Sequence, residues 1–454
     1  MKLYDSYDKT IKPFIPNTPN RVIMYVCGLT PYDDAHLGHA RTYISFDILK
    51  RYLIFKGYEV FHIQNITDID DKLINRAKET GEDPIRIADH YHTRALELFN
   101  ILNIIPADVY PKVSEHLSEI ETIVQALMDK GYAYRTRTGI YFDISKFDRY
   151  GKLSNQSIQE IDKHRIEPDP TKRNVSDFAL WKYTDDYTWD SKFGRGRPGW
   201  HIECSAMALK YSKGATLDIH GGARDLIFPH HENEIAQSEC YTGRKFANFW
   251  IHTGFLTVNG EKMSKSLKNF VTIRDVLSRY DPMAVRMMFA SVKYSSPIDY
   301  SEEAIQQAYQ NYNTLVQFYN RIKSTEPSDI NNTDNKNFLV NSIQEFYNNM
   351  DNDLNTPGAM SILFSIINYF NTHPVDRISK HLILNFINQI SFIFGLELKD
   401  DSKKKLDRLL ESLGDYRAEL RKTKRYDESD RLREVIQKAD IKVYDRADGS
   451  EYIY

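Results

Sequence analysis

The chain has 454 residues, which is more than one compact domain usually holds, so we expect two to four domains. Hydrophobic residues make up 41% and charged residues 27%, as in globular proteins that bury large cores, and no uninterrupted apolar run is long enough for a bilayer-spanning helix. The net charge of -3 excludes attraction of a nucleic acid by the field of the whole molecule, so such a partner would need a local basic patch.

The first part of the chain predicts a βαβ unit. The apolar run at 21–26 is a candidate buried strand, apolar residues at helical spacing predict a helix over 41–57, and 58–64 alternates like a strand. This order predicts parallel strands joined by a right-handed crossover. Ligands bind at the carboxyl ends of such strands, so we expect a site in the intervening loop CGLTPYDDAHLGHA.

More strands are predicted at 217–222 and 248–254, with a helix from about His231 between them. The polar segment between the two halves of the sheet is as large as a domain. We therefore interpret it as an insertion rather than as an ordinary connection. After Pro297 no strand is expected until a hairpin that turns at Asp448-Gly449.

The last third of the chain is predicted to be mainly helical. Apolar residues recur at helical spacing over 302–324, and 361–370 and 381–395 look like buried helices of a bundle. The stretch 325–337 is expected to be a loop or linker, and two or three short helices should precede the terminal hairpin.

Two motifs offer groups that bind phosphate. HLGH comes just before a predicted helix, where N–H groups and the imidazoles of His36 and His39 can stabilise negative charge, and Gly38 lets a flat base approach the backbone. GEKMSKSLKN follows a strand, and the ammonium groups of Lys262 and Lys265 suit the phosphates of ATP. Each has an ordinary alternative: HLGH can arise by chance, and surface lysines are usually only solvated.

Cys27, Cys204, His230 and Glu234 are candidate ligands of a metal ion. Two thiolates, an imidazole and a carboxylate suit Zn²⁺. His230 and Glu234 are four residues apart and should project from one helix face. The spacing alone leaves alternatives open, because the cysteines could be small core residues and the His/Glu pair could stabilise a helix.

Together the motifs resemble the class I aminoacyl-tRNA synthetases, whose signatures are HIGH and KMSKS, and most closely their cysteine-specific family. The matching stretches are YVCGLTPYDDAHLGHAR, NITDIDDKLINRA, GWHIECSAM, DIHGGARDLIFPHHENEIAQ, GEKMSKSLKN and DPMAVRMMFASVKYSSPIDYS. The resemblance continues less distinctly to the C-terminus. Leu37 stands in place of Ile, Ala223-Arg224 stands where Gly-Ser is common, and Cys240 matches no functional position, so we take it as a small buried thiol.

The resemblance implies an enzyme that activates L-cysteine with Mg²⁺-ATP and transfers it from cysteinyl-adenylate to the 3′ end of tRNA(Cys). One Zn²⁺ per chain, on the four ligands above, would select the thiolate of cysteine over the hydroxyl of serine without editing. The resemblance assigns ATP binding to His36, Gly38, His39, Lys262 and Lys265, and catalysis to the two histidines and two lysines. Trp200 would be the pocket wall. Thr67 and Asp68 are further pocket candidates, although NITDIDDK could instead be mainly a helix cap.

The implied fold is α/β, with an inserted connective domain, an all-α bundle and a small mixed α/β C-terminal module. The expected boundaries are 1–112 and 197–250 for the Rossmann-type catalytic domain, 113–196 for the insertion, 251–310 for the KMSKS loop and stem-contact region, 311–396 for the helical bundle and 397–454 for the anticodon-binding module.

Basic residues gather near the C-terminus, where the family binds the anticodon, and we expect a patch that contacts tRNA phosphates; the ordinary alternative is a solvated face. They are Arg417, Arg421, Lys422, Lys424, Arg425, Arg431 and Arg433. Three sparse cysteines and an N-terminus without an apolar signal core favour a cytosolic protein with no membrane partner. We expect a monomer and leave a dimer open.

Two other functions remain as alternatives. A ligase that joins cysteine to an amino sugar would share the catalytic core but lack the full C-terminal region. A non-catalytic relative would bind RNA or protein without the reaction. The complete motifs, the four ligand positions and the intact basic tail argue against both.

Overall fold

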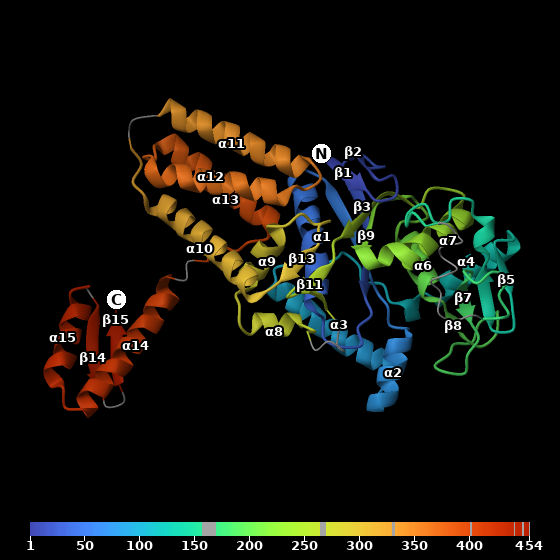
Figure 1. Cartoon of the computed structure of the whole chain (residues 1–454), viewed down its shortest axis with the longest axis horizontal. Helices are drawn as coiled ribbons and strands as arrows, with labels where there is room; N and C mark the ends of the chain where they lie inside the picture. The colour runs from blue at the N-terminus through green and yellow to red at the C-terminus, as the bar shows by residue number, and fades with distance from the viewer. Residues whose placement is uncertain are drawn as a thin grey trace. The chain divides into compact units, whose positions relative to one another are not determined.

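The computed structural model describes residues 1–156, 169–263, 269–328, 332–399, 402–439, 441–446 and 449–453. These residues form two compact units, Met1–Glu397 and Leu398–Tyr454, which are described separately. Figure 1 colours the chain from its N-terminus to its C-terminus.

A parallel sheet of four strands, in the order β10-β9-β3-β4, organises the larger unit. Its strands are β3 (Arg21–Leu29), β4 (Glu59–Ile66), β9 (Leu217–Ala223) and β10 (Ala247–Thr253). Every neighbouring pair is parallel, which confirms the predicted βαβ unit and α/β class. The strands therefore place their carboxyl ends at one edge of the sheet, where ligands of α/β proteins bind.

The connection between β3 and β4 is the helix α1 (Leu37–Phe55). It starts four residues before the predicted range, so HLGH forms its first turn instead of preceding it. Nearly the whole helix is buried, because it contacts β4 as well as the helices α9 (Pro282–Ala290) and α13 (Arg377–Phe394). A helix buried on every side has no polar face to mark its start, which explains the error.

Helices and a second sheet follow β4 before the chain returns to the parallel sheet. The helices are α2 (Asp71–Thr80), α3 (Pro84–Ile101) and α4 (Leu117–Asp129). The antiparallel sheet runs in the order β5 (Ala133–Arg135), β6 (Gly139–Phe142), β7 (Phe178–Lys182) and β8 (Arg197–Pro198). Its Phe142 and Trp181 share one hydrophobic core with Trp250 of the parallel sheet. The insertion is thus packed onto the sheet, and the boundaries given above stay predictions.

Two helices follow in the chain, one before and one after strand β9, and both carry residues of the candidate site described below. They are α6 (Trp200–Tyr211) and α7 (Glu232–Thr242), and they pack against each other (Figure 1). Four single turns complete this part: η1 (Val113–Glu115), η2 (Ile144–Lys146), η3 (Arg224–Leu226) and η4 (Ile227–His231).

Short strands frame the KMSKS region and the N-terminus. An N-terminal hairpin pairs β1 (Lys2–Asp5) with β2 (Thr10–Pro13), and a small sheet joins β11 (Leu256–Val258), β12 (Glu261–Lys262) and β13 (Ile298–Tyr300). The expectation of no strand directly after Pro297 is wrong, because β13 pairs with β11. Three residues are too few to show a period. The helix α8 (Ile273–Leu277) lies between these strands in the chain.

Four helices of the larger unit form the bundle in Figure 1. They are α10 (Glu302–Ser324), α11 (Thr333–Asp351), α12 (Thr356–Thr372) and α13. The loop predicted over 325–337 is partly wrong, since α11 begins at Thr333 with Asn332 as its cap. Its sequence is rich in Asn and reads as polar, but its buried Leu339, Phe346 and Met350 hold it in the bundle.

The smaller unit contains α14 (Ser402–Lys422), α15 (Tyr426–Gln437) and the antiparallel strands β14 (Lys442–Arg446) and β15 (Gly449–Ile453). The predicted hairpin strands are confirmed, while Asp448 of its turn lies outside the described residues. Its core consists of Leu410, Ile436, Ile441 and Val443. Across both units, none of the helices in the described parts of the chain has the length and apolar character needed to span a membrane.

Candidate metal and nucleotide site

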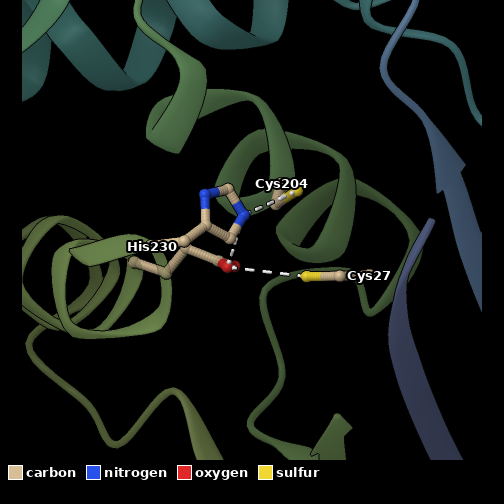
Figure 2. A group of neighbouring side chains, drawn as sticks. Cys27, Cys204 and His230 are labelled. Atoms are coloured by element: carbon tan, nitrogen blue, oxygen red, sulfur yellow. Dashed lines mark hydrogen bonds and ion pairs between the residues drawn. The ribbon is translucent and has the colours of Figure 1, made fainter. Parts of the chain in front are cut away.

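Four side chains from three separate parts of the sequence meet beside the parallel sheet; Figure 2 labels Cys27, Cys204 and His230. Cys27 lies near the carboxyl end of β3, Cys204 on α6, His230 in η4, and Glu234 in the first turn of α7. All four are buried, and their donor atoms lie within 4.8 Å of one another. The structure therefore brings together every residue predicted as a zinc ligand.

The distances within this cluster suit a small tetrahedral ion. His230 Nε2 lies 3.1 Å from Glu234 Oε1 and 3.4 Å from Cys204 Sγ. Cys27 Sγ lies 3.8 Å from Glu234 Oε1. Zinc bonds of about 2.0–2.3 Å hold tetrahedral donors about 3.3–3.8 Å apart. His230 and Glu234 meet as expected, although His230 belongs to the turn before α7 rather than to the same helix.

The bulge of β3 accounts for the position of Cys27. The pairing of β3 with β4 shifts between Val26 and Leu29, and the N–H of Gly28 donates to Asn65 Oδ1 at 2.8 Å. A Cβ on Gly28 would lie 1.6 Å from the carbonyl oxygen of Asn65, so only glycine fits there. This close approach fixes the backbone next to Cys27.

Burial and mutual contact perturb the acid–base properties of the cluster. A hydrogen bond with Cys27 lowers the pKa of Cys204 to about 6, although burial opposes this shift. Burial alone would lower the pKa of His230, but Cys204 and Glu234 raise it to about 10. Burial alone would raise the pKa of Glu234, but His220 and His230 together lower it to about 2. Burial raises the pKa of Cys27 well above its usual range, so the anionic donors of the cluster are Cys204 and Glu234, and a cation in this buried place would stabilise them.

Three buried histidines near these ligands were not predicted from the sequence. His220 Nε2 lies 2.9 Å from Glu234 Oε2, and His231 Nε2 lies 3.2 Å from Cys27 Sγ. His231 Nδ1 lies 2.8 Å from His252 Nε2. The signal that could have found His220 and His252 is one histidine in each of the neighbouring strands β9 and β10, and His231 directly follows the predicted ligand His230.

Trp200 stands at the open side of the cluster. Its side chain is 39% exposed, and its ring lies 4.5 Å from the ring of His230. A half-exposed indole against a buried ligand position fits the predicted pocket wall. That role stays a prediction.

The HLGH motif forms the amino-terminal turn of α1. The rings of His36 and His39 stack with centroids 3.6 Å apart, and the backbone N–H of His36 donates to His39 Nδ1 at 3.2 Å. Nδ1 of His39 is therefore an acceptor, so the proton of the neutral ring is on Nε2. Burial lowers the pKa of His39 well below its usual range, so this ring is a neutral hydrogen-bond donor rather than a cation.

The structure brings HLGH next to the KMSKS segment. The N–H of Leu37 donates to the carbonyl oxygen of Val271 at 3.0 Å, and that of Ile273 to Ala35 at 2.9 Å. A Cβ on Gly38 would lie 3.7 Å from Met263 Cε. The side chain of Lys262 and the whole of 264–268, with Lys265, lie outside the described residues. The roles of both lysines remain predictions.

Thr67 and Asp68 have buried structural contacts. Asn65 Nδ2 donates to Thr67 Oγ1 at 3.1 Å, and the N–H of Ser114 donates to Asp68 Oδ1 at 3.0 Å. Burial raises the pKa of Asp68. Asp70 caps α2 by accepting from the N–H of Lys72, as the helix-cap alternative predicts for this stretch. A pocket role for Thr67 and Asp68 stays a prediction.

One of the basic residues predicted to contact tRNA is buried. Arg417 is buried and donates from Nε to the carbonyl oxygen of Ser429 at 3.3 Å, so it does not belong to a surface patch. Its place on the buried face of α14 cannot be seen in a run of charges. Arg425 pairs with Glu428.

All three cysteines are free and buried, Cys240 included.

Comparison with known proteins decides the family. Residues 13–310 match the family model of the class I (C) tRNA synthetase catalytic domain, and residues 345–399 match the DALR domain. The chain belongs to the class I tRNA synthetases. Within that family, cysteine–tRNA ligase of Thermococcus gammatolerans is 43% identical over 470 residues, which cover 99% of this chain and 98% of the relative. The ligase of Pyrococcus horikoshii is 44% identical over 472 residues, which cover 100% and 98%.

Solved structures of other synthetases have the same fold. Mycobacterium tuberculosis methionyl-tRNA synthetase with methionyl-adenylate aligns with a TM-score of 0.64 at 15% identity, over 86% of this chain and 93% of that one. A leucyl-tRNA synthetase of Agrobacterium radiobacter in a ternary complex aligns with a TM-score of 0.62 at 10% identity, over 84% of each chain. At this identity the likeness concerns the fold alone, and it confirms the predicted fold class of this synthetase.

Proposed function

We propose that this class I synthetase is a cysteine–tRNA ligase that activates L-cysteine with Mg²⁺-ATP and transfers it to tRNA(Cys). One Zn²⁺, held by Cys27, Cys204, His230 and Glu234, would select the substrate. The observation that carries the proposal is the clustering of these four buried donors, with Cys27 near the carboxyl end of β3, the strand that leads into the turn carrying HLGH.

The donor set fits zinc and a thiol substrate. Sulfur, nitrogen and oxygen donors at tetrahedral separations are those zinc accepts. When bound, the ion supplies a Lewis acid that prefers the thiolate of cysteine to the hydroxyl of serine. Shape alone separates such near-isosteres by only about 10–200-fold. Trp200 would close the pocket above His230.

Activation needs charge stabilisation and alignment rather than a protein nucleophile. The carboxylate oxygen of cysteine attacks the α-phosphorus of ATP, the bond between the α- and β-phosphates breaks, and pyrophosphate leaves. His39 can donate Nε2–H to a phosphate oxygen, because its Nδ1 is already engaged by the N–H of His36. Lys262 and Lys265 would neutralise the phosphate charge that develops, together with Mg²⁺.

Transfer completes the reaction. The terminal ribose hydroxyl of tRNA attacks the carbonyl carbon of cysteinyl-adenylate, and AMP leaves. The exposed basic residues of α14 and α15, such as Arg421, Lys422 and Arg431, would hold the tRNA by its phosphates. The whole chain, by this proposal, acts as one aminoacylating enzyme.

Two assays test the proposal on the full chain. Cysteine should drive exchange of pyrophosphate into ATP, and serine should not. The same protein should then charge tRNA(Cys) with cysteine. Exchange without charging would favour a ligase for an amino sugar, and absence of exchange would favour a non-catalytic binder; either result overturns the proposal.

A further inference from the structure

We propose that the site binds a second divalent cation through Cys27, His220, His231 and Glu234, and that this second ion inhibits the enzyme. The inference rests on the proposed function, since it places the new ion beside the zinc ion of the first set. The four donor atoms of the second set are buried and lie within 4.8 Å of one another.

The separations in the second set lie within about 0.4 Å of those expected for metal ligands. His220 Nε2 lies 2.9 Å from Glu234 Oε2. His231 Nε2 lies 3.2 Å from Cys27 Sγ and 3.9 Å from Glu234 Oε1. Around a zinc-sized ion, donors are expected about 3.3–3.8 Å apart. Small shifts of the two imidazoles therefore suffice to enclose an ion.

Glu234 is placed to bridge two ions. Its Oε1 faces His230 of the first set, whereas its Oε2 faces His220 of the second set. The sulfur of Cys27 lies near both Glu234 and His231, so it can be shared as well. Each ion would then have two ligands of its own and two shared ligands. Carboxylate-bridged pairs of metal ions stand about 3.5–4 Å apart in two-metal sites.

The surroundings hold the two histidines in place for this role. The ring of His220 stacks on Trp250, with centroids 4.3 Å apart and planes 20° apart. His231 is held through Nδ1 by His252, whose Nδ1 in turn lies 2.8 Å from Ser6 Oγ. Nδ1 of His220 is buried and has no hydrogen-bond partner among the described residues. Stacking thus holds the ring of His220 and a hydrogen bond holds that of His231, and ligands held in this way bind a metal without a large loss of freedom.

The second ion should bind more weakly than the first and should be inhibitory. It would have to share Cys27 and Glu234 with an ion already present, and two divalent charges at this distance repel each other. Sharing these ligands withdraws negative charge from the first ion and changes its coordination. The first ion would then hold a substrate thiolate in an altered geometry, so cysteine activation should fall when zinc is in excess.

The experiment measures metal content and enzyme activity together. Metal-free full-length protein is titrated with Zn²⁺ in equilibrium dialysis, and with Co²⁺ under electron paramagnetic resonance. We expect a tight first equivalent and a weaker second equivalent. The second Co²⁺ should quench the signal of the first by spin coupling through the shared sulfur. Pyrophosphate exchange with cysteine should fall as the second equivalent binds.

Variants assign the second equivalent to its ligands. His220→Gln and His231→Gln should each keep the first equivalent and lose the second, and their remaining exchange activity should resist excess zinc. His62→Gln, which replaces a buried histidine outside both sets, is the matched control and should bind both metal equivalents and respond to excess zinc as the unaltered chain does. Melting curves that coincide with that of the unaltered chain would show that each variant is folded.

Three results would overturn this inference. The first is saturation at one equivalent, which would leave His220 and His231 as groups that only orient the ligands by hydrogen bonds. The second is a further equivalent that persists in both variants, because it then binds elsewhere. The third is a second equivalent without spin coupling or inhibition. Absence of even the first equivalent would instead contradict the proposed function, so the two failures are distinguishable.

Discussion

Asp47 on α1 and Arg286 on α9 form an ion pair in which neither side chain is exposed. Arg286 also donates from Nε to the carbonyl oxygen of Phe394 at 2.7 Å, at the end of α13. Arg51 donates to the same carboxylate of Asp47 at 2.8 Å. One buried carboxylate and two guanidinium groups thus join the helix that starts with HLGH to the end of the bundle.

Removing one partner of this pair should destabilise the larger unit. Arg286→Gln leaves the charge of Asp47 buried with one fewer cation and leaves the carbonyl of Phe394 without its donor. We expect a loss of about 3–5 kcal/mol in the free energy of unfolding, measured with urea. Arg286→Lys should rescue little, because an ammonium cannot reproduce the geometry of the guanidinium. Lys78→Gln, which removes an exposed pair with Asp186, is the control and should leave unfolding unchanged; equal effects would refute the argument.

Zinc removal and ligand replacement should abolish cysteine selection. Purified protein should contain about one tightly bound zinc per chain, with ligand distances of about 2.0–2.3 Å. Cys204→Ala should lose that metal and its cysteine-dependent pyrophosphate exchange. Cys240→Ala is the matched control, because this buried thiol lies outside the cluster. A metal-free protein that still prefers cysteine to serine would contradict the zinc assignment.

The KMSKS lysine should act mainly on the activation step. Lys265→Ala should lower the rate of pyrophosphate exchange about 10²–10³-fold, as expected for loss of one charge donor in the transition state. The Michaelis constant for cysteine should change little, since the metal cluster is untouched. Lys336→Ala, an exposed lysine on α11, serves as the control. Normal exchange in the Lys265 variant would mean that this lysine is only a solvated charge.

The smaller unit should be needed for tRNA but not for activation. A chain that ends at Glu397, the last residue of the larger unit, should keep cysteine-dependent exchange. It should charge tRNA poorly at low tRNA concentration, and the Michaelis constant for tRNA should rise. Charging by the full chain should weaken steeply with salt, and by the fragment less so, because fewer counterions are released. A cooperative melting curve of the fragment would show that it is folded. Equal charging of tRNA by the fragment and the full chain would exclude an anticodon-binding role for the smaller unit.

Buried His62 should make stability depend on pH. Burial lowers its pKa to about 3, and both ring nitrogens lack a hydrogen-bond partner among the described residues. In the unfolded chain its pKa is about 6.5, so below that pH the unfolded state binds a proton that the folded state does not. The free energy of unfolding should therefore decrease as the pH is lowered from about 6.5 to about 3. This group contributes at most about 1.4 kcal/mol per pH unit to the decrease. His62→Gln should flatten the curve from urea titrations, and identical slopes would disprove this.

The sequence predicts best what depends on local pattern. The strand at 21–26, the helix at 302–324 and the terminal hairpin strands are confirmed because apolar period and turn residues suffice for them. Tertiary packing decides the rest. Because of tertiary packing, α1 begins within HLGH and the Asn-rich α11 is part of the bundle. For the same reason, the side chain of Arg417 is buried.

For the site, resemblance located the four proposed ligands, whose separations along the chain carry little signal. His220 and His252 were not predicted because strand alternation shows only that a residue is buried, and His231 lies in a short turn that has no period. Alternation does not show what the residue faces. Glu234, the partner of His220, and Cys27, the partner of His231, come from other elements, which a local pattern cannot relate.

The backbone hydrogen bonds that tie Leu37 to Val271 and Ile273 to Ala35 have a consequence for engineering. The chain on one side of the KMSKS loop is pinned to the start of α1, and β12 is paired with β11 on the other side. The number of residues between these two anchors therefore limits how far the segment between them can extend. Under the proposed function, lengthening or shortening this segment should alter ATP binding, whereas amino-acid selection, which we propose for the metal cluster, should not change. The two properties can be redesigned one at a time.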